Sequence, residues 1–235
     1  MTVNDIMSEL KTYGNEQIKK ILLKHGVQEP LYGVKVEDLK KIQKKIKKDY
    51  SLAKELYMTG NADAMYLAGL IADDDNMTAE DLDEWVSRAT SANISEYTVP
   101  WVAGGSRYGM QLGMKWIDAP EEYIATAGWA TLSGLVSVTP DEQLDLTTLQ
   151  QLLTRIEQLI ATSPNRVRYQ MNNYMICLGA YVNSLTDDAL ATAAKVGKVS
   201  VEMNGTACKV PDAGEYIAKI AAKGTLGKKK KMLKC

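Results

Sequence analysis

The sequence predicts an all-α fold in which antiparallel helix pairs stack into an α–α superhelix. Apolar residues recur at helical spacing in nearly every segment of the 235 residues. Segments bounded by Gly, Pro, Asp or Ser follow one another without one long crossover loop. Only residues 199–203 look extended, and one short strand cannot form a sheet. We therefore expect a single solenoid domain over residues 1–235.

The individual helices follow from periodicity and from start signals. The first predicted helix covers residues 6–24, and a Gly-rich turn follows it through Gly33. Thr78 and Asp81 form a capping signature, and Pro100 predicts a kink or a fresh start within 94–101. The other predicted helices cover 36–48, 51–58, 61–71, 78–89, 106–117, 121–136, 146–161, 164–183, 187–196 and 212–223. Pairs spaced by roughly 35 to 45 residues fall within the range of helical repeats.

Charge is segregated along the chain, although the net charge is only -1. Lys and Arg outnumber Asp and Glu by 12 to 8 in residues 1–60 and by 12 to 5 in residues 166–235. Residues 61–165 carry 4 basic and 16 acidic residues. Two basic ends flank an acidic middle, so net charge alone says nothing about the partners of this protein.

The helix at 36–48 separates its apolar and basic residues. Wound at about 100° per residue, Val36, Leu39, Ile42 and Ile46 share one arc of about 120°. The opposite face carries Lys40, Lys41, Lys44, Lys45, Lys47 and Lys48. Such a face can lie along a phosphate backbone, and it is also typical of a solvated surface.

The few cysteines and the single histidine argue against metal and cofactor chemistry. The single histidine, His25, precedes Gly26 and is expected to cap the C-terminus of a helix. Three cysteines without metal-binding spacing indicate a reducing compartment. We therefore expect no metal site and no cofactor. With no apolar stretch of about 18 residues and no signal peptide at the start, a cytoplasmic protein is expected.

Several stretches resemble the HEAT-like DNA alkylation repair family. They are Tyr32–Ile42, Asn61–Ile71, Ser95–Trp101, Gly205–Pro211 and the lysine run after Gly227. The similarity covers most of the chain and points to a branch of the family other than its best-known glycosylases. It implies a right-handed stack of helix pairs whose positively charged concave face holds duplex DNA. Active members release N3- or N7-alkylpurines by breaking the glycosidic bond.

The chain departs from the catalytic motif of that family. The motif resembles Trp-Asp-x-Val-Asp, and the corresponding residues are Ser95 to Val99, with Ser95 at the tryptophan position and Val99 at the catalytic carboxylate position. No tryptophan of the chain is followed four residues later by an acid. Glu96 is the only nearby acid that could stabilise a sugar cation, and it could equally interact with free amides at a helix start.

The remaining candidate DNA-binding residues lie in the middle and at the C-terminal end. Arg166 and Arg168, with Tyr169, Asn172 and Asn173, place donors near a helix start, where phosphate binds readily. The arginines could instead pair with acids of the preceding helix. Arg107, Lys115, Lys228 and Lys229 complete the set. The lysines of the C-terminal run are expected to graze the backbone or to be disordered. Trp101, Trp116 and Trp129 are expected in the core.

Two functions follow from these observations. The first is a DNA alkylation repair-like protein that binds duplex DNA, alkylated or not, on a basic concave face. It would be an alkylpurine DNA glycosylase only if Glu96 replaces the missing carboxylate. The second is a non-catalytic α-solenoid scaffold for a protein or RNA partner. The acidic middle favours the second, because Arg88, Arg107, Lys115 and Arg155 are the only basic residues of that segment up to Asn165.

Overall fold

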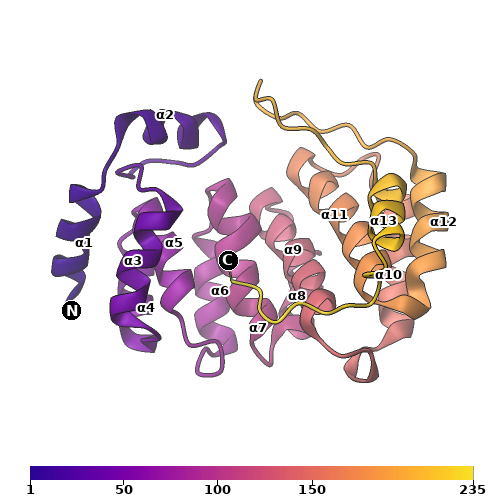
Figure 1. Ribbon diagram of the computed structural model, residues 1–235, viewed down its shortest axis with the longest axis horizontal. Coiled ribbons are helices and arrows are strands. Elements are labelled where there is room, and N and C mark those ends of the chain that lie inside the picture. The colour runs from indigo at the N-terminus through magenta and orange to yellow at the C-terminus, as the bar shows by residue number, and fades with distance from the viewer. Residues whose placement is uncertain (235) are drawn as a thin grey trace.

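Two curved layers of helices build the molecule. The computed structural model describes residues 1–234, and none of them forms a strand. The inner layer consists of α3 (Val36–Ile46), α5 (Ala62–Ile71), the π-helical turn η1 (Ile94–Thr98) continuing into α7 (Val99–Gly105), α9 (Glu122–Val138), α11 (Asn165–Tyr181) and α13 (Ala213–Ala222). Neighbouring members of this series pack on one another, and their concave side faces the viewer in Figure 1. The predicted all-α superhelix is confirmed.

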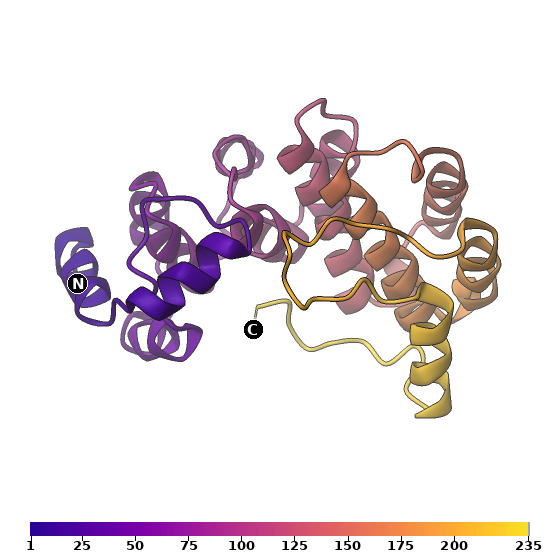
Figure 2. The same ribbon diagram turned by 90° about the horizontal axis from the view of Figure 1, so that it is seen from above.

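The outer layer lies on the convex side. It consists of α4 (Tyr50–Met58), α6 (Ala79–Ser87), α8 (Gly109–Trp116), α10 (Leu146–Leu159) and α12 (Thr186–Val196). The helix α1 (Val3–Thr12) stands at the N-terminal end, and α2 (Glu16–Lys24) crosses the rim beside it (Figure 2). Short 3-10 turns, η2 (Asp141–Gln143) and η3 (Asn183–Leu185), precede α10 and α12. No helix among residues 1–234 combines the length and the apolar character needed to cross a bilayer.

The predicted helix over residues 6–24 is wrong, because the chain breaks at Tyr13 to Asn15. Tyr13 caps the C-terminus of α1, and the Asn15 side chain accepts the backbone N–H groups of Gln17 and Ile18 to start α2. Asparagine is among the best helix N-caps. The chain therefore starts a new helix at Asn15, although the helical spacing of apolar residues continues through the break. Other local signals were sound: His25 caps α2, and Thr78 and Asp81 form a reciprocal capping box.

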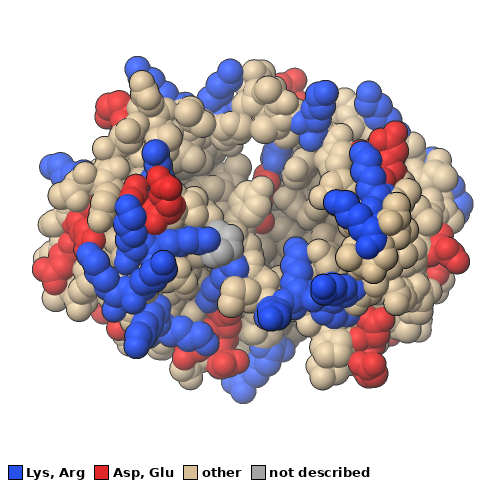
Figure 3. Space-filling view, viewed as in Figure 1, with Lys and Arg blue, Asp and Glu red and all other residues tan. Residues whose placement is uncertain are grey.

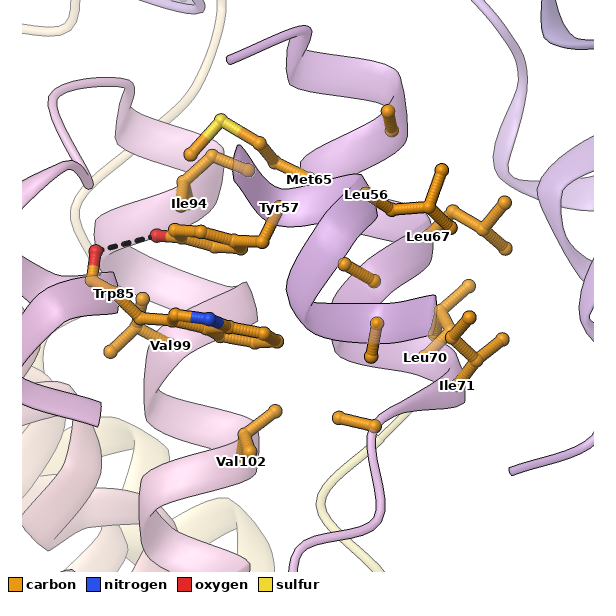
Figure 4. Close-up of a cluster of buried hydrophobic side chains, with 14 of the residues drawn as sticks. Leu56, Tyr57, Met65, Leu67, Leu70, Ile71, Trp85, Ile94, Val99 and Val102 are labelled. Carbon is orange, nitrogen blue, oxygen red and sulfur yellow. Dashed lines mark hydrogen bonds between the residues drawn. The ribbon is translucent and has the colours of Figure 1, made fainter. Parts of the chain in front are cut away.

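The core is continuous along each half of the arc. In the first half, the Tyr57 and Trp85 rings stack at 4.0 Å, and the Tyr57 hydroxyl donates to the Trp85 carbonyl at 2.7 Å (Figure 4). In the second half, Trp129 packs edge-on against Tyr174 with ring centroids 5.5 Å apart. The central helix α9 packs against α7, α8 and α11 and joins the two halves. The layers are thus held by ordinary apolar burial.

Pro100 coincides with a change of helix type, as its effect on backbone hydrogen bonding predicts. The chain is π-helical from Ile94 to Thr98 and becomes α-helical at Val99. Proline lacks the N–H that a continuing helix would use, and π-helical turns are common near functional sites. This irregular turn lies at the middle of the concave face and presents Glu96 and Tyr97.

Asp63 holds the loop that leads into α3. Its carboxylate is 4 % exposed and accepts the backbone N–H groups of Tyr32, Gly33 and Val34 at 2.5, 3.0 and 3.0 Å. Burial raises the pKa of the Asp63 carboxyl, and these three donors oppose that effect. The loop and α5 are therefore joined by one side chain.

We expect Asp63→Asn to lower the free energy of unfolding by about 1–3 kcal/mol, because an amide presents only one acceptor oxygen to three buried donors. Urea denaturation measures the loss. Glu80→Gln, at an exposed position in α6, is the matched control and should change the stability by no more than about 0.5 kcal/mol. Equal stability of the two variants would contradict the role given to Asp63.

Candidate nucleic-acid interface

The concave face is bordered by basic surface rather than lined by it uniformly. In Figure 3, blue side chains gather over α3 on the left, along the C-terminal segment below the centre, and over α13 on the right. A hollow separates the N-terminal and C-terminal parts of the face between these groups. Cations at separate places around a concave surface can contact phosphates that are not on one straight backbone.

The two faces of α3 form only in part as predicted. Leu39 and Ile42 are buried and the lysines of the helix lie on the opposite side, but Val36 of the predicted apolar arc is 41 % exposed at the first position of the helix. The helix ends at Ile46, so Lys47 and Lys48 follow it instead of lying on its basic face. Lys41, Lys45 and Lys48 pair with Asp38, Glu9 and Asp73 at 2.7, 2.6 and 3.2 Å, with 55 to 61 % of each lysine side chain exposed. Exposed ion pairs of this kind contribute little to stability, so a phosphate can compete with the carboxylates for these lysines. Lys40 and Lys44 form no ion pair among the described residues.

An ion pair joins Glu96 of η1 to Arg166 at the start of α11. The Arg166 Nε donates to Glu96 Oε1 at 2.6 Å, and Arg166 Nη2 donates to Oε2 at 2.7 Å. Gln170 Nε2 donates to the same Oε2 at 3.2 Å. The side chain of Glu96 is 3 % exposed and that of Arg166 is 27 % exposed. This forked geometry is the strongest form of an arginine–carboxylate contact.

The surroundings of Arg166 hold the guanidinium in place. Its backbone N–H donates to Glu122 Oε1 at 2.6 Å, so an acid of α9 caps α11. The guanidinium lies over the Tyr169 ring at 4.6 Å. Burial opposes the charge on Arg166, but the hydrogen bonds and the charge of Glu96 outweigh it and raise the pKa of Arg166. Arg166 is therefore a charged residue held at the floor of the concave face.

This geometry changes the expectations for both residues. Arg166 pairs with an acid, but the acid lies 70 positions earlier in the chain rather than in the preceding helix. Glu96 is neither a free carboxylate nor a cap for helix amides, because both of its oxygens accept from Arg166 and Gln170. A carboxylate committed in this way is poorly placed to stabilise a sugar cation, since it would have to leave its partner.

The aromatic residues beside the pair face a small cavity. Tyr97, Trp101 and Tyr169 line a cavity of about 190 Å³ together with Glu96 and Asn173. Trp116 and Trp129 are buried as expected, whereas Trp101 is only partly buried and meets the Tyr97 ring at 5.9 Å. A second cavity of about 270 Å³ lies against the same ion pair and reaches His25 and Asn204.

Val99, the residue expected at the catalytic carboxylate position, does not line these cavities. It is fully buried beside Trp85 in the first core cluster (Figure 4). Tyr97 and Trp101 occupy the groove side of this segment instead. Val99 therefore has neither a charged group nor access to the groove.

The other predicted residues lie in different surroundings. Asn173 reaches the cavity beside Glu96, but Asn172 is 2 % exposed and donates to the Pro211 carbonyl, so its amide is used within the protein. Arg168 Nε is buried without a hydrogen-bond partner among the described residues. Lys115 belongs to α8 and pairs with Asp83 at 2.6 Å, away from the concave side.

Three further basic residues show why charge alone is a poor guide to the interface. Arg107 lies in the turn between α7 and α8 and donates to the Tyr108 hydroxyl at 2.8 Å. Lys228 is exposed in the C-terminal segment. Lys229 turns inward, where its ammonium binds Asp141 at 2.7 Å and the Val136 carbonyl at 2.9 Å. The segment is ordered by contacts such as these, in place of the loose run expected from its composition.

Sequence reasoning missed the contribution of Gln170 and the groove-facing position of Tyr97. No local pattern indicates either one, because both depend on the packing of η1 against α11. Groups of three or more potential metal ligands are absent from residues 1–234. The fold and this face define an α-solenoid of HEAT-like repeats with a partly basic concave surface.

Comparisons with known proteins give the family. The sequence profile described as DNA alkylation repair enzyme matches residues 6–217. Uncharacterized proteins of Listeria innocua and Listeria monocytogenes are each 31% identical over 225 residues, covering 93% of this chain and 97% of theirs. The chain belongs to the DNA alkylation repair enzyme family.

A solved structure is similar over the whole length. Its TM-score is 0.92 at 34% sequence identity, with 100% of both chains covered. That protein is described as a member of a new family of proteins related to the HEAT-like repeat DNA glycosylases, with affinity for branched DNA structures. The fold therefore has a solved counterpart with the same arrangement of helices.

We expect Arg166→Ala to lower the free energy of unfolding by about 3 kcal/mol, because it leaves the buried Glu96 carboxylate without its partner. The double variant Glu96→Gln with Arg166→Ala should lose less than the sum of the two single variants, since it removes the uncompensated charge. Chemical denaturation of the four proteins forms a double-mutant cycle. A loss below about 1 kcal/mol for Arg166→Ala, or strict additivity, would argue against this coupling.

Proposed function

We propose that this protein binds DNA on its concave face, prefers branched DNA, and does not release alkylated bases. The observation that carries the proposal is the Glu96–Arg166 pair at the centre of a face bordered by lysines. The pair presents a fixed guanidinium next to aromatic side chains, but it leaves no free carboxylate. Such a site can hold phosphate and unstacked bases without attacking a glycosidic bond.

The layout of the basic groups supports a branched ligand. The lysine face of α3 and the basic surface near α13 lie at opposite ends of the arc, separated by the hollow (Figure 3). Duplex arms that diverge from a branch point can reach both groups, whereas one straight duplex passes fewer of them. The similar solved protein has affinity for branched DNA structures, and shared architecture at 34% identity supports the same preference here.

The binding proposal predicts steep salt dependence and a preference among DNA shapes. We expect a four-way junction to bind at least tenfold more tightly than a linear duplex of the same length, a difference of about 1.4 kcal/mol. The log-log slope against salt should be about -3 or steeper if three or more phosphates are contacted. Fluorescence anisotropy over a series of salt concentrations measures both quantities.

Two variants serve as a matched pair in that experiment. Lys40→Ala with Lys44→Ala removes two lysines of α3 that form no ion pair with residues 1–234, and it should make the slope shallower by almost two. Lys54→Gln with Lys195→Gln changes the charge equally on α4 and α12 of the outer layer and should leave the slope unchanged. Absence of binding by the unaltered protein at low salt, or equal affinity for both DNA shapes, contradicts the proposal. Tight, salt-insensitive binding to RNA or protein would favour the scaffold.

The catalytic prediction needs a separate assay. We expect no release of 7-methylguanine or 3-methyladenine from methylated duplex DNA beyond the level seen with heat-inactivated protein, because Glu96 is engaged by Arg166. Chromatography of released bases measures this. Release by the unaltered protein that disappears in Glu96→Gln would instead establish Glu96 as a catalytic residue and overturn this part of the proposal.

A further inference from the structure

The middle repeats leave an electrostatic gap in the proposed interface. Their few cations are engaged or lie on the outer layer: Lys115 pairs with Asp83 at 2.6 Å, and Arg155 of α10 pairs with Asp118 at 2.6 Å. Arg88, at the end of α6, pairs with Glu84 at 3.6 Å. The inner helices between α5 and α9 therefore offer few free cations of their own to a phosphate backbone.

The C-terminal segment 223–234 crosses this part of the concave face. It leaves α13 and runs back over the inner helices toward the N-terminal half, as both ribbon views show (Figures 1 and 2). The Gly227 N–H donates to the Ala180 carbonyl at 2.8 Å, and the Lys230 N–H donates to the Ser137 carbonyl at 2.8 Å. Its backbone is thus bonded to the C-terminal ends of α11 and α9. We call this segment the strap.

Small residues in α7 and α9 make room for the strap. Leu233 packs over Gly104 and Gly134, where an added Cβ would come within 2.9 and 3.3 Å of its methyl group. A larger side chain at Gly104 would push the leucine away. The far end is held by Lys234, whose ammonium meets Asp74 and the Ala72 carbonyl, each at 2.6 Å. The strap is therefore seated on the inner layer.

The strap uses its lysines for two purposes. Lys229 and Lys234 have side chains only 19 and 14 % exposed, and each is bound to an aspartate. Lys228, Lys230 and Lys231 are exposed and form no ion pair with the described residues. Anchoring two ammonium groups inside the protein thus leaves three others on its surface.

The free lysines continue the basic surface of α3. A cleft of about 750 Å³ lies between the strap and α3, and Lys231 borders it together with Lys44 and Lys47. Lys230 lies over the Tyr181 ring at 5.3 Å, toward α11. The strap therefore bridges the separation between the basic groups at the two ends of the arc.

We propose that the strap is a built-in part of the DNA-binding surface, with Lys228, Lys230 and Lys231 supplying the phosphate contacts that the acidic middle repeats lack. This inference rests on the proposed DNA binding and adds residues and a position to it. The anchors Leu233, Lys229 and Lys234 fix where these cations lie. Unlike a loose basic tail, the seated strap presents its charges at defined places on the concave face.

The test compares three variants of the full chain on the same four-way junction. The triple variant K228Q/K230Q/K231Q should weaken binding at least tenfold at low salt and reduce the log-log salt slope by about two to three. The charge-matched control K54Q/R155Q/K195Q, on the outer helices α4, α10 and α12, should retain the affinity of the unaltered protein. The anchor variant Leu233→Asp keeps all strap lysines and should weaken binding because their placement is lost.

The outcomes separate this inference from the proposed function. If the unaltered protein binds the junction and the triple variant binds equally well with the same slope, the strap inference fails and DNA binding stands. Tighter binding by the triple variant or by Leu233→Asp would show that the strap blocks the face, which also overturns the inference. Failure of the unaltered protein to bind DNA refutes the proposed function itself. Thermal unfolding monitored by circular dichroism confirms that each variant is folded.

Discussion

The forked ion pair between Glu96 and Arg166 is the contact on which the centre of the concave face depends. The segment η1 belongs to the first core cluster and the start of α11 to the second, so the pair ties the halves together at the concave face. Separating the partners would leave a buried carboxylate uncompensated, at a cost of about 3–5 kcal/mol. The guanidinium lies over the Tyr169 ring, and Tyr97 and Tyr169 line the cavity beside Glu96. This one ion pair therefore fixes where the Arg166 guanidinium lies at the centre of the groove and keeps it charged.

The structure also shows how the stretch that resembles the catalytic motif of the family, Ser95 to Val99, is used in this chain. The π-helical turn ends at Thr98, two residues before Pro100, and Val99, the residue expected at the carboxylate position, packs into the core. The acid that remains beside the groove, Glu96, is buried and accepts hydrogen bonds from Arg166. A carboxylate used to hold an arginine and a carboxylate used to stabilise an oxocarbenium ion are alternative uses of one group, because the first use neutralises the charge that the second requires.

In the folded protein, several acids of the middle segment form ion pairs with lysines from the two basic ends. Several of its carboxylates receive lysines from distant parts of the chain: Asp73 binds Lys48, Asp74 binds Lys234, and Asp141 binds Lys229. The middle repeats thus attract the basic ends toward themselves. In this way a chain with a net charge of -1 presents cations along a concave surface. Some acids form ion pairs with lysines, and the remaining lysines stay exposed.

Local sequence signals determined the helical class, most helix positions, the caps at His25 and Thr78, and the two faces of α3, because periodicity and capping act within a few residues. They failed at Tyr13 to Asn15, where an apolar period runs through a break, and they said nothing of the contacts that define the site. The Glu96–Arg166 pair spans 70 positions and the Lys234–Ala72 contact spans 162. Such partners meet only when the superhelix curves. The sequence by itself determined which charges this protein carries, and only the tertiary structure decided which of them are paired and which stay free.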